Sequence, residues 1–346
     1  MRLPGLIDPH VHLREPGAVH KEDWASGTAA ALAGGFTQVL AMPNTEPPIV
    51  DSPSLAMVHA LAEKKARCDY AQYLGAGADN LATAAGCAQS SAGLKLYLDQ
   101  TYGPLHLDAI ALWKAHFEAW PLNRPLVVHA EGRTLAAAIL VSALTDRPLH
   151  VAHVATREEI LLVRDAKAHG LKISCEVTPH HLFLTGADLP GGLGEVRPRL
   201  GTQADVDALW ENLDVIDCFA TDHAPHTAAE KNSDNPPPGF PGLETALPLF
   251  LNAVHEGRLT LADVVVRMSD NVRKIFKIPE QPETWVEVDL NARTELSARN
   301  MHSKAGWTPF EGYQKWGKVT QVVLRGEPVY RDGEVLAPPG FGRRIR

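Results

Sequence analysis

Short apolar runs alternate with longer Ala- and Leu-rich stretches along most of this chain. The short runs are rich in β-branched residues, and in the longer stretches apolar residues recur about every 3.6 positions, as on one face of a helix. Eight such runs span residues 6–12, 37–41, 69–74, 94–98, 126–129, 149–153, 172–177 and 215–220. Helices are expected between them, for example over residues 24–33, 54–65 and 158–169. Eight successive βα units predict an α/β protein with a closed (β/α)₈ TIM barrel.

The pattern changes after residue 279. Residues 285–290 and 319–333 alternate like strands of a small β appendage, with a hairpin turn at Asp332-Gly333. We therefore expect a barrel over residues 1–279 and a small β subdomain with a C-terminal tail over residues 280–346, packed on the barrel. The basic stretch from Pro338 onward is predicted to have no fold of its own. The abrupt start of the chain indicates a piece of a longer polypeptide.

Composition narrows the functional class. A 346-residue chain with 45% hydrophobic residues can bury a large core. Its net charge of -8 argues against nucleic-acid and anionic-membrane partners, which favour clustered Lys and Arg. We find neither a membrane-spanning stretch nor a signal peptide. The four cysteines lack metal-site spacing and are expected to be reduced, so the composition favours a cytoplasmic enzyme.

Polar residues gather where the predicted strands end. In (β/α)₈ barrels the chemistry lies at the carboxyl ends of the strands. The polar residues at or beside those ends are His10, His12, Asn44, His129, His153 and Asp222, with Lys95 inside the fourth strand. His10 and His12 are alternate residues of one strand, so both imidazoles point to the same side. Taken alone, that pair is more often two solvated histidines than a metal site.

The histidines and Asp222 form a nitrogen-rich set that suits zinc or another first-row divalent ion. Five ligands are too many for one tetrahedral site, whereas a bridged pair of ions would use them all. Lys95 is the candidate bridge, because a buried amine with a lowered pKa can react with CO₂ to give a carbamate with two ligand oxygens. An ion-paired or snorkelling lysine is the alternative for this position.

Several longer motifs surround these residues. They are Asp8-Pro9-His10-Val11-His12-Leu13-Arg14-Glu15-Pro16-Gly17, Ala41-Met42-Pro43-Asn44-Thr45, Gly93-Leu94-Lys95-Leu96-Tyr97, Val128-His129-Ala130-Glu131, Glu176-Val177-Thr178-Pro179-His180-His181, Thr221-Asp222-His223-Ala224-Pro225-His226 and Pro238-Gly239-Phe240-Pro241-Gly242-Leu243-Glu244-Thr245. With them the chain resembles the dihydroorotases of the amidohydrolase superfamily from Leu3 to about Pro279. The resemblance is greatest to the dihydroorotase domain of the multifunctional animal proteins that begin pyrimidine synthesis.

The resemblance implies a role for each matching residue. One zinc would be held by His10, His12, carboxylated Lys95 and Asp222, and the other by Lys95, His129 and His153. Asp222 would also be the catalytic acid and base. The substrate's α-carboxylate end would be bound by Arg14, Asn44, Arg197 and His226, and by backbone groups of Pro238 and Gly239. Thr101, in the Thr101-Tyr102-Gly103-Pro104 turn, would touch substrate from a lid, although an ordinary βα loop is equally compatible with that turn.

The implied reaction is the reversible closure of N-carbamoyl-L-aspartate to L-dihydroorotate, within a larger multifunctional polypeptide that forms a homodimer. A related hydrolase of dihydropyrimidines, hydantoins or allantoin is one alternative. Arg14 and Arg197 argue against it, because guanidinium groups favour a substrate with a carboxylate. An inactive scaffold domain is the other alternative, although such domains typically lose the ligands that this chain retains.

The remaining histidines receive other interpretations. His180 and His181 are expected to be structural or to lie on the polar rim, and His223 to point away from its neighbour Asp222. Some animal relatives have a Cys where this chain has Ala152, so we doubt any further metal site there, and Glu176 is expected to support the metal ligands from behind. No chemistry is assigned to His20, His59, His106, His116, His150, His169, His255 and His302.

Overall fold

The computed structural model describes residues 1–346. Its strands are β1 (Arg2–Pro4), β2 (Leu6–Val11), β3 (Phe36–Ala41), β4 (Asp69–Gln72), β5 (Leu74–Gly75), β6 (Leu94–Tyr97), β7 (Leu126–His129), β8 (Leu149–Val151), β9 (Ile173–Val177), β10 (Cys218–Phe219), β11 (Trp285–Glu295), β12 (Gln314–Leu324), β13 (Glu327–Arg331) and β14 (Glu334–Val335). Every predicted apolar run therefore contains a strand. The last run is mostly irregular, since only Cys218 and Phe219 of residues 215–220 are in β10.

Helices fill the intervals between the strands. They are α1 (Trp24–Ala33), α2 (Ser52–Lys65), α3 (Leu81–Ala84), α4 (Ile110–Ala119), α5 (Arg133–Leu144), α6 (Arg157–Ala168), α7 (Pro179–Phe183), α8 (Gln203–Glu211), α9 (Ala228–Lys231), α10 (Ala246–His255), α11 (Leu261–Val265) and α12 (Asn271–Phe276), with the π-helical turn η3 (Val266–Asp270) between the last two. Short 3₁₀ turns are η1 (Ala85–Cys87), η2 (Gly191–Gly194) and η4 (Ala298–Asn300). None of the helices combines the length and the apolar content that crossing a membrane requires.

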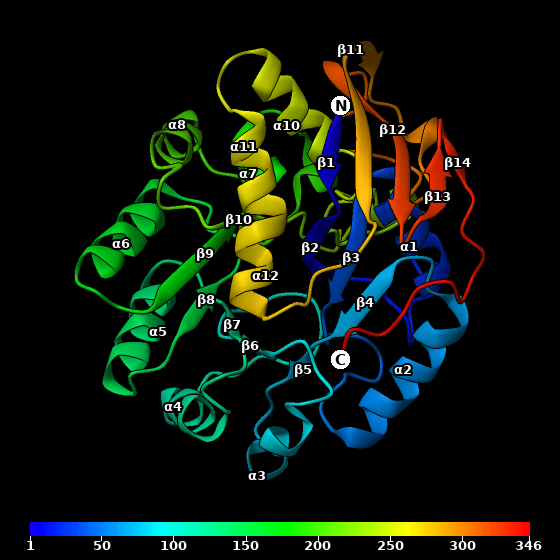
Figure 1. The fold of residues 1–346 in the computed structure, drawn as a ribbon. Helices are drawn as coiled ribbons and strands as arrows, with labels where there is room; N and C mark the ends of the chain where they lie inside the picture. Colours follow the sequence, from blue (N-terminus) through cyan, green and yellow to red (C-terminus); the bar gives the residue numbers. More distant parts are fainter.

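Two parallel sheets form the centre of the molecule. One contains β2, β3 and β4, and the other contains β5 to β10, each in chain order. The predicted strand over residues 69–74 is split, because Tyr73 separates β4 from β5. At the far end, Val11 and His223 form an isolated parallel bridge, and the His12 N–H donates to the His223 carbonyl at 2.7 Å. Figure 1 shows α4, α5 and α6 outside the strands that they connect.

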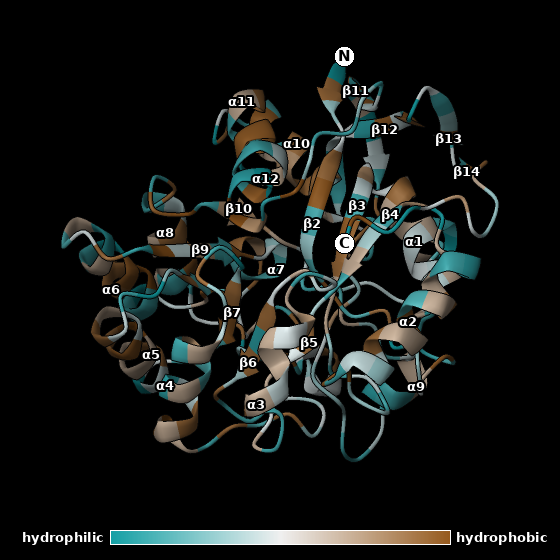
Figure 2. Cartoon of the chain, turned by 60° about the horizontal axis from the view of Figure 1, so that its bottom comes forward, coloured by the Kyte–Doolittle hydropathy of each residue, from teal (hydrophilic) through white to brown (hydrophobic).

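Local sequence signals explain where the helices begin and which faces they bury. At the start of α6, the Thr156 hydroxyl accepts a hydrogen bond from the Glu159 N–H, and the Glu159 carboxylate accepts one from the Thr156 N–H. Its apolar side chains Ile160 and Val163 are fully buried. In Figure 2 the inner strands are largely brown, whereas the outer helices carry both teal and brown, as expected for strands covered by amphipathic helices.

The C-terminal strands form an antiparallel sheet of their own. Its order is β1-β11-β12-β13-β14, so its first strand comes from the N-terminus, which we did not predict. The turn at Asp332-Gly333 links β13 to β14, as expected, but a second turn at Arg325-Gly326 links β12 to β13 and was missed. Both residues of that second turn have positive φ, 56° and 79°. The boundary at residue 279 between the barrel and the subdomain stays a prediction.

The C-terminal tail contains no helix or strand, as expected, but it is held against the parallel sheet. The tail pairs with β4, since the Tyr70 N–H donates to the Arg343 carbonyl at 3.0 Å and the Ile345 N–H donates to the Tyr70 carbonyl at 2.8 Å. Figure 1 shows the red end of the chain beside β4. Docking of this kind uses backbone groups at a strand edge, so the tail's basic side chains gave no indication of it.

Candidate metal centre and substrate pocket

His10 and His12, at the end of β2, face one carboxylate. The Nε2 atoms of His10 and His12 lie 3.2 Å and 3.1 Å from Oδ1 of Asp222. Asp222 follows β10 and has a φ of 45°, a backbone conformation that is uncommon outside glycine and that clusters at functional sites. The carboxyl ends of β2 and β10, which belong to different parallel sheets, therefore meet at this point, as the strand pattern predicted.

Hydrogen bonds decide which nitrogen of each ring carries the proton. His10 Nδ1 is 2.5 Å from Glu176 Oε1 and donates to it. Asn44 Nδ2 donates to the Tyr102 carbonyl, so the Asn44 amide oxygen accepts from His12 Nδ1 at 2.7 Å. Burial lowers the pKa of His12 to about 4, so its ring is neutral. In the Nδ1–H tautomer of each ring, the Nε2 atom presents a lone pair to Asp222.

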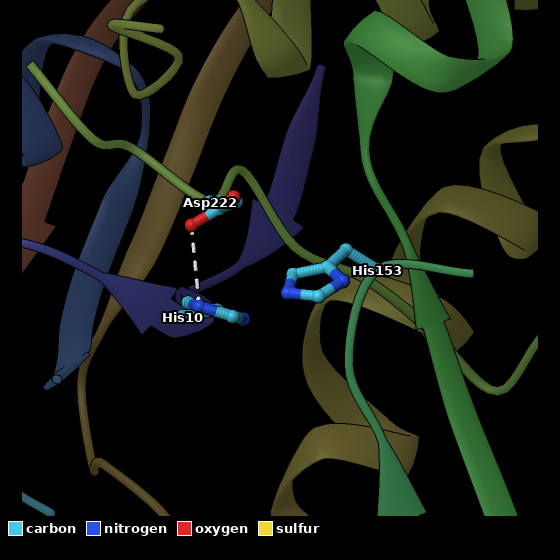
Figure 3. Close-up of side chains that lie close together, drawn as sticks. All are labelled: His10, His153 and Asp222. Atoms are coloured by element: carbon cyan, nitrogen blue, oxygen red, sulfur yellow. Dashed lines mark ion pairs between the residues drawn. The ribbon is translucent and has the colours of Figure 1, made fainter. Parts of the chain in front are cut away.

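Two lone pairs and a carboxylate oxygen thus converge with no proton between them. Like acceptors at this distance repel one another unless a cation lies between them. Ligand atoms of His10, His153 and Asp222 all lie within 4.8 Å of one another, and Figure 3 shows the three side chains turned toward a common point. The donor set fits a divalent metal ion.

His129 and His153 form the second part of the cluster. His129 Nε2 donates to Glu131 Oε1 at 3.0 Å, so its Nδ1 is an acceptor, and it lies 2.9 Å from His153 Nε2. His153 follows β8 with a φ of 35°, and its buried Nδ1 has no hydrogen-bond partner. Burial and the nearby His129 hold the pKa of His153 well below its ordinary value. The neutral ring of His153 can act as a ligand, and His129 lies beside it.

Lys95 is neither ion-paired nor snorkelling. It lies on β6 with no exposed surface, and its Nζ has no hydrogen-bond partner. The face of the Tyr97 ring, 5.3 Å away, is its one cation–π contact. Burial lowers the pKa of Lys95 to about 8, which leaves a substantial fraction of the amine neutral and nucleophilic. Such an orphaned buried amine fits the carbamate interpretation better than either alternative.

His150 belongs to the same network, contrary to our prediction that it has no convergent partner. Its Nε2 is 3.1 Å from Glu176 Oε2, and its Nδ1 is 2.9 Å from the Ser174 hydroxyl. Burial would raise the pKa of Glu176, but its contacts with His10 and His150 lower it to about 2. Glu176 thus stays ionised and fixes the orientation of His10, which agrees with its predicted support of the metal ligands.

One cavity brings the predicted metal ligands and most of the predicted substrate contacts together. Its lining includes His10, His12, Arg14, Asn44, Thr101, His129, His153, Arg197, Asp222, Pro238 and Gly239. Lys95 lies buried on β6, and His226 lies beside Arg14, with its Nε2 3.1 Å from Arg14 Nη2. The cavity has a volume of only about 20 Å³, and Arg14, Asn44 and Tyr102 line both this cavity and an outer pocket of about 420 Å³.

The loop that carries Gly239 depends on close backbone packing. Gly239 has a φ of 142°, and a Cβ at this position would lie 2.4 Å from the Ala224 carbonyl oxygen. No side chain is tolerated there. The buried ammonium of Lys231 donates to the carbonyls of Glu195 and Pro237 at 2.6 and 3.0 Å, which ties this loop to the segment of Arg197. No sequence signal pointed to Lys231.

Three other histidines have structural contacts. His181 Nε2 donates to the Pro198 carbonyl at 3.2 Å, next to Arg197, and His180 is buried beside it. His223 points away from Asp222, as predicted, because its Nε2 lies 3.2 Å from Glu22 Oε2 and its Nδ1 accepts from the Gly242 N–H.

Comparison with known proteins agrees with these motifs. Residues 1–90 match the family model described as "Dihydro-orotase-like". The whole chain is 58% identical to part of "Multifunctional protein CAD" from Squalus acanthias, of which it spans 16% of the length. The chain is also 39% identical to "Dihydroorotase" from Pyrococcus abyssi, in an alignment that covers 99% of this chain and 86% of that protein. The chain belongs to the dihydroorotase family. The multifunctional relatives are far longer than this chain, which spans 16% of the length of the Squalus acanthias protein.

Solved structures share the fold of this dihydroorotase-family chain. An L-hydantoinase (dihydropyrimidinase) from Arthrobacter aurescens superposes with a TM-score of 0.94, with 24% identity over all of this chain and 88% of the hydantoinase. An inactive dihydroorotase-like domain of a CAD-like multifunctional protein from Chaetomium thermophilum gives a TM-score of 0.87, with 29% identity over all of this chain and 99% of that domain. The amidohydrolase fold expected from the sequence is therefore supported, while fold alone does not select an activity.

Proposed function

We propose that the chain is a dihydroorotase, which closes N-carbamoyl-L-aspartate to L-dihydroorotate and reopens the ring in pyrimidine biosynthesis. The observation that carries this proposal is the single cavity in which a nitrogen-rich metal-ligand set faces the guanidinium groups of Arg14 and Arg197. A substrate that has both a hydrolysable amide and a carboxylate matches the two halves of this cavity. Ring closure joins a dianion and one proton to give a monoanion and water.

Two zinc ions complete the proposed centre. His10, His12 and Asp222 would hold one ion and His129 and His153 the other, with the carbamate of Lys95 between them. The converging lone pairs at Asp222 and the orphaned amine of Lys95 support this set. Bound divalent ions supply Lewis acidity, which polarises an amide carbonyl and lowers the pKa of water.

Asp222 is the residue that moves the proton. In ring opening its ionised carboxylate takes a proton from the attacking water and delivers it to the leaving ring nitrogen. In ring closure the same carboxylate takes the proton of the ureido N–H as that nitrogen attacks the β-carboxyl carbon, and delivers it to the departing oxygen, which leaves as water with one further proton from solvent. The carboxylate lies beside both His10 and His12 inside the cavity, which is where a proton carrier must act.

The other cavity residues orient the substrate. Arg14, Asn44, Arg197 and His226 bind the α-carboxylate end, and backbone groups of Pro238 and Gly239 contact the ring. Thr101 reaches the substrate from a lid, the turn that contains Tyr102. The small size of the inner cavity, and the larger pocket that shares Tyr102 with it, support a lid that opens for entry.

Replacing Arg14 tests the proposal. For Arg14→Ala we expect KM for N-carbamoyl-L-aspartate to rise about 100-fold, because a buried charge-assisted contact to a carboxylate is lost. Metal content, measured by atomic emission, should be unchanged. Arg199→Ala is the matched control, since Arg199 is exposed two residues beyond Arg197. An unchanged KM in Arg14→Ala would move carboxylate recognition elsewhere.

Two other functions fit the site less well. A hydrolase of neutral cyclic amides would leave Arg14 and Arg197 without a partner in the cavity, at a cost in binding. An inactive scaffold is disfavoured because the ligand residues and Asp222 are all present and converge. Turnover assays with dihydroorotate and with hydantoin separate the three possibilities, because a scaffold domain turns over neither.

The proposal extends to the fold and the assembly. The two parallel sheets would be arcs of one closed (β/α)₈ barrel, which the single-residue gap at Tyr73 and the bond from His12 to His223 support. Residues 280–346 would be a β subdomain packed on it. The length of the multifunctional relatives supports a larger polypeptide. A cytosolic homodimer remains our expectation; four buried, unpaired cysteines are compatible with that compartment.

A further inference from the structure

Lys21 is a buried cation behind the substrate pocket. It lies in the loop between β2 and α1, is 5% exposed, and does not line the cavity. Its Nζ is 3.0 Å from His226 Nδ1, 3.1 Å from Glu230 Oε1 and 3.3 Å from the Tyr102 hydroxyl. An ammonium has three N–H groups and no acceptor, so these three contacts satisfy it completely.

His226 lies between this ammonium and a guanidinium. Its Nε2 is 3.1 Å from Arg14 Nη2 and 3.0 Å from the Pro238 carbonyl oxygen. Burial and the two cations hold the pKa of His226 far below its ordinary value, so the ring is neutral. A neutral imidazole carries one proton, and it must be on either Nδ1 or Nε2.

The contacts select Nε2. Lys21 can only donate, so Nδ1 must accept, and the proton on Nε2 then donates to the Pro238 carbonyl. The opposite tautomer would set an N–H against the ammonium and leave the Pro238 carbonyl without this donor. Arg14 has another acceptor, because its Nε donates to the Pro225 carbonyl at 3.1 Å, and its side chain also lines the cavity.

We propose that Lys21 is a positioning residue that fixes His226 as the Nε2–H tautomer, so that His226 and Arg14 present two donors side by side to one substrate carboxylate. The inference rests on the proposed function for the identity of that substrate. In the free protein the Nε2–H donates to the Pro238 carbonyl and lies beside an Arg14 N–H, so a substrate carboxylate next to both donors would share or replace the Pro238 acceptor and relieve the repulsion between them. A second positive charge behind the imidazole strengthens its N–H as a donor.

The test combines kinetics with a direct observation of the tautomer in the zinc-loaded enzyme. Histidine labelled with ¹⁵N reports which ring nitrogen is protonated, and the signals absent from His226→Asn identify His226. We expect Nε2–H in the unaltered protein and a loss of that preference in Lys21→Met, which retains the aliphatic volume. KM for N-carbamoyl-L-aspartate should rise about 10-fold in Lys21→Met, with kcat changed less than about 3-fold. Lys21→Arg, which keeps a charged donor, should recover part of the loss.

His20→Gln is the matched control. The exposed His20 ring also contacts Glu230, 3.1 Å away, but does not touch His226, so its loss should leave the tautomer and KM unchanged. An Nδ1–H tautomer in the unaltered protein overturns the inference, and this measurement decides even if Lys21→Met does not fold. An unchanged tautomer and KM in Lys21→Met also overturn it. If the unaltered protein shows Nε2–H but does not turn over N-carbamoyl-L-aspartate, the proposed function fails while the role of Lys21 in the tautomer stands.

Discussion

Lys95→Ala is expected to lower kcat/KM for ring opening at least about 1,000-fold, because the ligand that joins the two proposed metal sites is lost and their Lewis acidity is worth several kcal/mol. Bound zinc, measured by atomic emission after gel filtration, should fall in parallel. Apart from the cation–π contact with Tyr97, Lys95 has no polar contact, since its Nζ forms no hydrogen bond. The loss should therefore trace to the metal centre.

Two companion variants separate chemistry from packing. Lys95→Met keeps most of the buried volume but cannot form a carbamate, so we expect it to be as inactive as Lys95→Ala. Lys95→Glu offers two carboxylate oxygens nearby and should retain part of the zinc and of the activity. Full activity in Lys95→Met would rule out the bridge.

Carboxylation itself can be observed with ¹³CO₂. A carbamate signal should appear in the unaltered protein and be absent from Lys95→Ala. Lys231 is a built-in control, since burial also lowers its pKa to about 8, but its ammonium is held by the carbonyls of Glu195 and Pro237. The signal should therefore persist in Lys231→Met.

Asp222→Asn is expected to reduce kcat in both directions by about 100- to 10,000-fold, the usual contribution of a positioned general acid or base. The amide has nearly the same shape as the carboxylate but cannot carry the proton between water and the ring nitrogen. Initial rates of ring opening and closure, followed by the absorbance of dihydroorotate, measure the effect. The ratio of forward to reverse kcat/KM must stay constant, because it is fixed by the equilibrium of the reaction.

Asp217→Asn is a suitable control for this prediction. Asp217 directly precedes β10. Its carboxylate accepts hydrogen bonds from the Lys167 ammonium and from the Cys175 N–H, but it does not line the cavity. Its loss should affect thermal stability more than kcat. If Asp222→Asn kept a tenth or more of the activity, another group would have to carry the proton.

Much of the candidate site could be predicted because it follows the strand pattern. His10, His12, His129 and His153 lie at the ends of apolar runs, and parallel strands bring their ends to one edge whatever the loops do. The family motifs added Arg14 and Arg197 by position. None of these assignments required knowledge of an individual side-chain contact.

Other features were invisible because they depend on contacts between distant segments. His150 looked like an ordinary strand residue, and its bond to Glu176 exists only because β8 and β9 are neighbours in register. The docking of the tail on β4 uses backbone groups, which no side-chain pattern reveals.

By itself, the sequence determined which side chains are available, which face of each strand or helix is apolar, and where each strand ends, because these depend on periodicity over a few residues. Only the tertiary structure decided which ring nitrogen of a buried histidine carries the proton, and which acceptors a buried cation such as Lys21 contacts. Lys21 and His226 are 205 residues apart in the chain, and only the folded path sets their nitrogens 3.0 Å from each other. Hydrogen bonds require geometry within tenths of an ångström, and that geometry is a property of the whole fold.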